Sequence, residues 1–273
     1  MIRFIRLTVF VFGVVLSSFL IADPLVFGIV PQQSAKKLAA TWSPMLAELS
    51  KRTGFQVIFS TAKDIPTFER RLAEGKYDIA YMNPYHFVDY HGSSSYQALA
   101  EQKNKRIQGI LVTRKDSGNA TLSDLNNQTL AFPAPAAFSA TIISQAILRE
   151  EQVNTKAKYV SSHDSVYLNM ARGFMPAGGG VMGTLKAAPS EVQSQLSILW
   201  KSEKYTSHAI ATKTDPPEDT REIILAALLS MNDDEGVSNL LEAINFSGFE
   251  KANNSDWDDV RNLDIQILSG ESE

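Results

Sequence analysis

Residues 25–34 read LVFGIVPQQS, and they predict the start of an α/β fold. Leu25 to Val30 is a short apolar run of the kind found in buried strands, and Pro31 ends it. Ser34 is a good N-cap for a helix. The helix that follows carries apolar side chains at helical spacing, at Leu38, Trp42, Met45, Leu46 and Leu49. The stretch therefore predicts a strand that leads directly into an amphipathic helix.

The same pattern continues over the next fifty residues. Residues 55–59 and 77–82 predict two further strands. A helix through Phe68 and Leu72 lies between them and ends at Gly75. A strand–helix–strand–helix–strand order predicts a parallel sheet with helices on both faces.

A second α/β set follows a strand predicted at 107–113 and the polar stretch 114–120. We expect strands at 129–132, 158–161, 196–200 and 208–212, and helices at 139–150, 164–172, 218–231 and 236–244. Gly178, Gly179 and Gly180 predict a tight turn. The predicted α/β architecture has residues 23–113 and 209–273 in a discontinuous lobe 1, and 114–208 in lobe 2. Two crossover strands, near residues 113 and 208, would join the lobes and leave a ligand cleft between them.

The first 22 residues predict a secretory signal peptide. Arg3 and Arg6 give a positive start, an apolar run covers 7–21, and Ala22 offers a small residue for cleavage. The run is too short for a stable membrane span, although an uncleaved anchor is the alternative. We therefore expect an exported protein, which in a Gram-negative host means the periplasm.

Composition excludes several classes of protein. The 273 residues are 44% hydrophobic and 21% charged, which excludes a disordered or fibrous chain. The net charge of -4 and the lack of a basic run argue against a nucleic-acid partner. There is no cysteine, so disulfides and thiolate metal sites are excluded. The histidines also lack metal-ligand spacing, and we expect neither a metal nor a cofactor.

Polar residues follow several of the predicted strands, and ligands of α/β folds bind at such strand ends. We expect the ligand to contact residues from five segments: Gln32 and Gln33; Tyr81, Asn83 and Tyr85; Phe138, Ser139, Ala140 and Thr141; His163, Asp164, Ser165 and Tyr167; and His208. Around Ser139, the free N–H groups of a helix start and two hydroxyls would form a cradle for an oxyanion. Ser139 could instead serve only as the N-cap of that helix.

The histidines of these segments allow two interpretations. His163 and His208 could donate hydrogen bonds to an oxyanion, more strongly if they are protonated. Each could equally be a neutral histidine that is hydrogen-bonded near the junction of the lobes.

Five motifs resemble those of one protein family. They are GIVPQQS (28–34), DIAYMNPY (78–85), FSAT (138–141), SHDSVY (162–167) and TSHAIA (206–211). In this order, across nearly the whole mature chain, they are similar to PhnD-type substrate-binding proteins of phosphate, phosphite and phosphonate ABC transporters. The resemblance implies a type II periplasmic binding fold, in which two lobes close on a small anion. It also implies that 139–141 match the Ser/Thr-rich turn that binds phosphonate, and that Tyr81 and Tyr85 lie in the aromatic segment of the other lobe.

Two departures from the family pattern concern the ligand. The middle of the turn is Ala140, which has a backbone N–H to offer but no hydroxyl. Family members that bind aminoalkyl phosphonates use acidic residues to hold the ammonium, and residues 174–180 contain none. We therefore expect a smaller oxyanion, such as phosphite, phosphate or methylphosphonate.

The sequence favours a binding protein over an enzyme. It has no nucleophile elbow, Walker loop or zinc-protease motif, so an exported hydrolase is the less favoured reading. We expect a monomeric solute-binding protein that delivers a small anion to an ABC permease. The alternative is a protein that presents the same ligand to a membrane sensor kinase.

Overall fold

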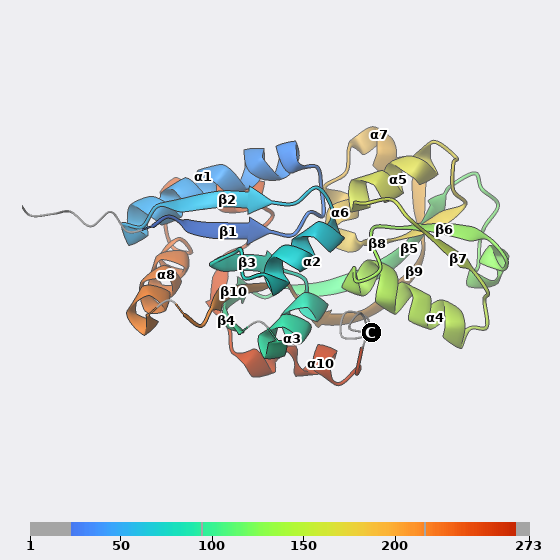
Figure 1. The fold of residues 1–273 in the computed structure, drawn as a ribbon. Coiled ribbons are helices and arrows are strands. Elements are labelled where there is room, and N and C mark those ends of the chain that lie inside the picture. Colours follow the sequence, from blue (N-terminus) through green and yellow to red (C-terminus); the bar gives the residue numbers. More distant parts are fainter. Residues whose placement is uncertain (1–22, 94, 216, 266–273) are drawn as a thin grey trace, which may run out of the picture.

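The computed structural model describes residues 23–93, 95–215 and 217–265. Figure 1 shows two sheets beside each other, each covered by helices, and we call each sheet with its helices a lobe. The predicted signal peptide, residues 1–22, lies outside the described residues. Within the described part of the chain, none of the helices has the length and hydrophobicity of a membrane span.

The sheet of lobe 1 has six strands in the order β11-β4-β10-β3-β1-β2. Its strands are β1 (Leu25–Ile29), β2 (Val57–Thr61), β3 (Ile79–Met82), β4 (Tyr96–Gln102), β10 (Ala209–Lys213) and β11 (Phe249–Lys251). β1 pairs in parallel with β2 and β3, which confirms the predicted parallel unit. β10 pairs antiparallel with β3 and β4, so a segment far along the chain completes this sheet.

Helices cover both faces of this sheet (Figure 1). They are α1 (Ala35–Thr53), α2 (Ile65–Ala73), α3 (Pro84–Ser93), α8 (Glu218–Ser230), η3 (Glu235–Val237), α9 (Ser238–Ala243), η4 (Asn254–Trp257) and α10 (Asp258–Arg261). The Ser34 side chain accepts a hydrogen bond from the Lys37 amide and caps α1, as predicted. Gly54 ends α1 in the left-handed conformation, with a φ of 76°, which glycine adopts without strain.

The sheet of lobe 2 has five strands in the order β7-β6-β8-β5-β9. Its strands are β5 (Arg106–Arg114), β6 (Thr129–Phe132), β7 (Lys156–Tyr159), β8 (Ala177–Val181) and β9 (Leu196–Thr206). Its helices are η1 (Leu122–Leu125), η2 (Phe138–Ile143), α4 (Ser144–Glu150), α5 (His163–Ala171), α6 (Met182–Lys186) and α7 (Ser190–Gln193). Successive β5 side chains alternate between faces: Ile110 shares a core cluster with Met170 of α5, whereas Leu111 shares one with Leu148 of α4.

The chain passes between the sheets twice, through residues 103–105 and 207–208. The second passage agrees with the crossover expected near 208. The first differs from the expected one near 113, because β5 pairs with β8 and β9 in the second sheet. The apolar run 107–113 predicts a strand but contains no information about which distant strand it pairs with.

Candidate functional site

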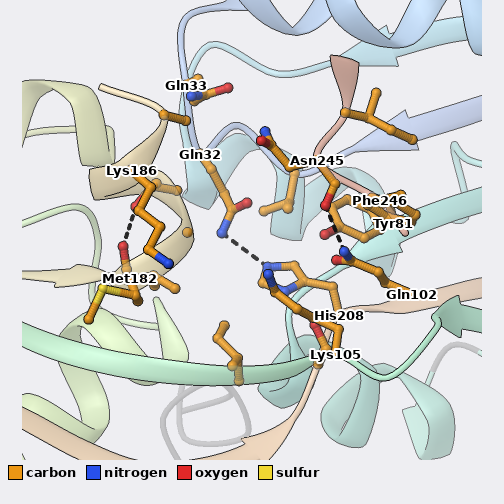
Figure 2. A pocket seen from close by; sticks show the side chains of 18 of the residues that line it. Gln32, Gln33, Tyr81, Gln102, Lys105, Met182, Lys186, His208, Asn245 and Phe246 are labelled. Carbon is orange, nitrogen blue, oxygen red and sulfur yellow. Dashed lines mark hydrogen bonds between the residues drawn. The ribbon is translucent and has the colours of Figure 1, made fainter. Parts of the chain in front are cut away.

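Two hollows lie between the lobes, next to the crossovers. The larger, which we call the outer pocket, has a volume of about 450 Å³ (Figure 2). The smaller, the inner slot, has about 10 Å³, roughly the space that holds one water molecule. Both are lined by Val30, Gln32, Ile107, Val181 and His208, so the two hollows adjoin.

The inner slot is lined by the turn that carries Ser139. This turn, η2, is π-helical and continues into α4, and its N-cap is Ala137, so the alternative role of Ser139 as the N-cap is wrong. Ser139 and Thr141 are each 1% exposed, and neither hydroxyl has a hydrogen-bond partner among the described residues. The amides of Phe138, Ser139 and Ala140 begin the helix, where N–H groups have no acceptor within the helix. The turn therefore places unused donors and the positive end of a helix dipole beside the slot.

A strand of glycines supports this turn. Gly178, Gly179 and Gly180 lie in β8, a fully buried strand, so the tight turn predicted for them is wrong. A Cβ on Gly179 would lie 1.8 Å from the carbonyl oxygen of Ala140. One on Gly109, in the neighbouring strand β5, would lie 2.4 Å from the carbonyl oxygen of Ser139. The glycines are needed because the backbone of the turn lies directly on the backbone of the sheet.

Two buried histidines line the slot from other directions. The Nε2 atom of His208 lies 3.1 Å from Nε2 of Gln32, and its ring stacks on Tyr81 with centroids 4.9 Å apart. Burial lowers the pKa of His163 to about 4. Burial, and then the nearby charges of His163, His86 and Lys105, lower the pKa of His208 to about 3. Both rings are therefore neutral near pH 7, and each keeps one N–H that can donate to an anion.

The lobes contact each other directly around these hollows. The backbone N–H of His163 donates to the carbonyl oxygen of Gln32 at 3.1 Å. Asn83 Nδ2 donates to the carbonyl oxygen of Ala136 at 3.1 Å, and Lys37 Nζ donates to that of Ala187 at 2.8 Å. Asn83 also accepts from the amide of His86 and so caps α3. The conformation is therefore one in which the lobes are closed against each other.

The structure brings many of the predicted site residues together. Lining one or both hollows are Gln32, Gln33, Tyr81, Asn83, Phe138, Ser139, Ala140, His163 and His208. Five others line neither hollow: Tyr85, Thr141, Asp164, Ser165 and Tyr167.

Tyr167, Ser165 and Asp164 interact with other parts of the protein. The Tyr167 hydroxyl lies 2.7 Å from Thr184 Oγ1 and accepts a hydrogen bond from the amide of Val181. Ser165 hydrogen-bonds to Ser162 at the start of α5. Burial raises the pKa of Asp164, while the charge of Lys37 in lobe 1 opposes that shift.

Sequence reasoning missed most of the polar lining of the outer pocket. It includes Gln102, Asn104, Lys105, Gln108, Lys186 and Asn245. The run Lys103–Arg106 suggests a solvated turn between strands, and it does form a largely exposed turn between β4 and β5, which is also the first passage between the lobes. Had the sequence placed the first crossover at 103–105, Lys105 would have been expected to line the cleft between the lobes. Trp42, one of the apolar side chains of the predicted first helix, is 4% exposed and also lines the pocket.

Solved structures share this fold. A binding-protein component of an ABC phosphonate transporter from Pseudomonas aeruginosa aligns with a TM-score of 0.81 and 18% identity, over 88% of this chain and 85% of that one. PhnD1 from Prochlorococcus marinus, solved in complex with methylphosphonate, aligns with a TM-score of 0.81 and 16% identity, over 88% and 96% of the two chains. These similarities confirm the predicted two-lobed type II periplasmic binding fold.

Sequence comparison identifies the family. The Phosphate-import protein PhnD of Mycolicibacterium smegmatis is 24% identical over 204 residues, 67% of this chain. The match spans 64% of that relative's length. A family profile described as "ABC transporter, phosphonate, periplasmic substrate-binding protein" matches residues 27–257. The chain therefore belongs to the family of periplasmic substrate-binding proteins of phosphonate ABC transporters, as its motifs suggested.

Proposed function

We propose that this protein captures a small phosphorus oxyanion, such as a phosphonate, phosphite or phosphate, for an ABC importer. The observation that carries the proposal is the buried hydroxyl of Ser139, which lines the slot, together with that of Thr141 two residues further along the same turn; neither has a hydrogen-bond partner among the described residues. A buried hydroxyl is costly unless it is hydrogen-bonded, so an acceptor that occupies the site periodically explains why both are there. An oxyanion supplies several acceptor oxygens at once, and a helix start with free amides favours its charge.

Capture would work by closure of the lobes. The slot as it stands holds about one water molecule, so an oxyanion needs the lobes to separate before it enters. The two short passages at 103–105 and 207–208 are where the chain would bend. An anion held by Ser139 of lobe 2 and by Gln32 of lobe 1 would then stabilise the closed form.

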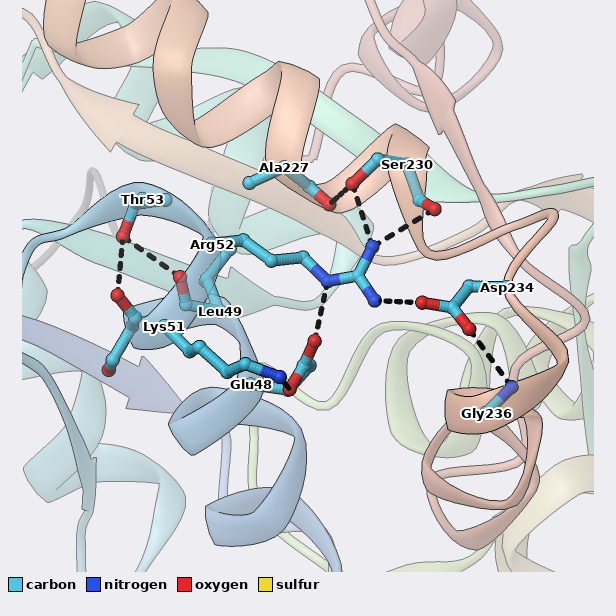
Figure 3. Close-up of polar contacts among 10 residues, drawn as sticks. Glu48, Leu49, Lys51, Arg52, Thr53, Ala227, Ser230, Asp234 and Gly236 are labelled. Carbon is cyan, nitrogen blue, oxygen red and sulfur yellow. Dashed lines mark hydrogen bonds and ion pairs between the residues drawn. The ribbon is translucent and has the colours of Figure 1, made fainter.

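The lobe division and cellular setting belong to the same proposal. We assign 23–102 and 209–265 to lobe 1 and 106–206 to lobe 2. Arg52 of α1 donates to the carbonyl oxygen of Ser230 at 3.1 Å and pairs with Asp234 (Figure 3). These contacts support the assignment of the C-terminal segment to lobe 1. The Arg52 hydrogen bond lowers the pKa of Asp234 and so favours its charged form.

The partner would be an ABC permease that recognises the closed form of a monomeric binding protein, exported by cleavage after Ala22. Family members are periplasmic substrate-binding proteins, which supports this setting. Nothing in the family match favours the alternative partner, a membrane sensor kinase.

The test is calorimetry with methylphosphonate and phosphite on the mature chain and on Ser139→Ala and Thr141→Val. A hydrogen bond to a charged acceptor contributes about 1.5–3 kcal/mol, so each variant should bind roughly ten- to a hundredfold more weakly. The free energy of unfolding should hardly change, because neither hydroxyl has a partner to lose within the described part of the chain.

Ser50→Ala is the matched control. The Ser50 hydroxyl donates to the carbonyl oxygen of Leu46 and accepts from the amide of Val57, far from the slot. This variant should lose roughly 1 kcal/mol of stability and keep its anion affinity. Full anion affinity in both Ser139→Ala and Thr141→Val would contradict the proposed site.

A further inference from the structure

Among the residues that the structure describes, positive side chains and no acid line the outer pocket. Among the described residues that line it are Lys105, Arg106, Lys186 and Lys204, and no aspartate or glutamate. Arg106 is already engaged, since it lies 3.3 Å from Asp259 and donates to Thr206 Oγ1 at 2.7 Å. The three lysines form no ion pair within the described part of the chain. Their charges therefore face the pocket without a balancing carboxylate.

Two of these lysines lie where a bound molecule would reach them. Lys105 is half-buried in the first passage between the lobes, close enough to His208 to lower its pKa. Lys186 is in α6 of lobe 2, and Figure 2 shows its amine directed into the pocket, on the opposite side from Lys105. Because His208 also lines the inner slot, Lys105 is adjacent to the proposed oxyanion site.

The remaining walls suit the organic part of a larger ligand. Trp42 and Tyr81 are packed with ring centroids 4.9 Å apart, and Phe246 lies 5.6 Å from Trp42. The carboxamides of Gln33 and Asn245 also line the pocket and supply neutral polar groups. The volume of about 450 Å³ is within the usual range for pockets that hold organic ligands, and far larger than methylphosphonate requires.

We propose that the natural ligand carries a second anionic group, separated by an organic linker from its phosphorus oxyanion, and that Lys105 and Lys186 hold this second group. The class is that of phosphonocarboxylates and of organic phosphates with another carboxylate or phosphate. The inference rests on the proposed function, because it takes the slot as the site of the first oxyanion. An ammonium group in the same position would face uncompensated lysines and be repelled.

The test uses three phosphonates that share a three-carbon chain and differ in the group at its far end, which is negative, neutral or positive. They are 3-phosphonopropionate, propylphosphonate and 3-aminopropylphosphonate, titrated by calorimetry into the mature protein. We expect the carboxylate to bind about tenfold more tightly than the propyl compound, and the amine more weakly than both. Equal affinities, or a preference for the amine, would overturn this inference and leave the oxyanion site intact. If no phosphonate of the series binds, nor phosphite or phosphate, the proposed function falls as well.

Variants locate the second group. In Lys105→Gln and Lys186→Gln, the ratio of carboxylate to propyl affinity should fall several-fold, and in the double variant it should approach one. Lys201→Gln is the matched control, since Lys201 is an exposed lysine of β9 that does not line the pocket. Its ratio should equal that of the wild type. A ratio unchanged in the double variant would show that these lysines do not hold the carboxylate.

Discussion

Replacing Gly179 with alanine should destabilise the protein and displace the turn that carries Ser139. The new Cβ would lie 1.8 Å from the carbonyl oxygen of Ala140, and 2.6 and 2.7 Å from two ring carbons of Phe132. Real Cβ atoms essentially never approach other atoms within 3.0 Å. The backbone of the turn, or the strand beneath it, must therefore move by more than about 1 Å.

The size of the effect follows from what the new methyl group meets. Overpacking a core usually costs about 1–3 kcal/mol, because side chains can turn aside. Here the closest atom is a backbone oxygen with no freedom to rotate away, so we expect about 3 kcal/mol or more. Urea unfolding should show a lower midpoint at an unchanged slope. Methylphosphonate should also bind at least tenfold more weakly, because the displaced turn supplies the proposed anion donors.

Gly183→Ala is the control for this prediction. Gly183 lies in the helix α6, and nothing lies within 4 Å of the position that its Cβ would take. Alanine is the better helix residue, so this change should stabilise the protein by about 0.5–1 kcal/mol. The reasoning would be refuted if Gly179→Ala cost less than about 0.5 kcal/mol, since the turn could then not lie directly on β8.

Two further predictions concern buried groups near the slot. Burial lowers the pKa of His163 from 6.5 to about 4, so below pH 6.5 the unfolded chain takes up a proton that the folded state refuses. The free energy of unfolding should therefore fall by about 2 kcal/mol between pH 7 and pH 5 because of this histidine. Measured by urea unfolding, His163→Gln should lose correspondingly less stability over the same pH range. The same pH dependence in the variant and the wild type would contradict this. Tyr167→Phe should cost about 1–3 kcal/mol in the same assay, because the buried amide of Val181 loses its acceptor, while anion affinity stays the same. A large loss of affinity at full stability would instead place the Tyr167 hydroxyl in the site.

Much of the local structure could be predicted from the sequence. The apolar run 25–30, the cap at Ser34 and the helical spacing from Leu38 to Leu49 correspond to β1 and α1 as observed. The position of Ser139 and His163 at the starts of helices after strands also followed from neighbouring residues. Such features depend on side chains that lie within a few residues of one another, so they can be recognised directly in the sequence.

Other features depended on segments that are distant along the chain. Whether β5 pairs in the first or the second sheet is decided by β8 and β9, about 70 and 90 residues later. Gly178–Gly180 suggested a turn because glycine is common in turns. In the structure they form a strand, and Gly179 lacks a side chain because the backbone of Ala140 lies directly against it. Lys105 and Lys186, 81 residues apart, face the same pocket only after both crossovers have formed. The sequence by itself thus determined most of the elements, the family and the position of the turn that carries Ser139. Only the tertiary structure decided the pairing of β5 and the charge of the outer pocket, because both arise from contacts that no local pattern records.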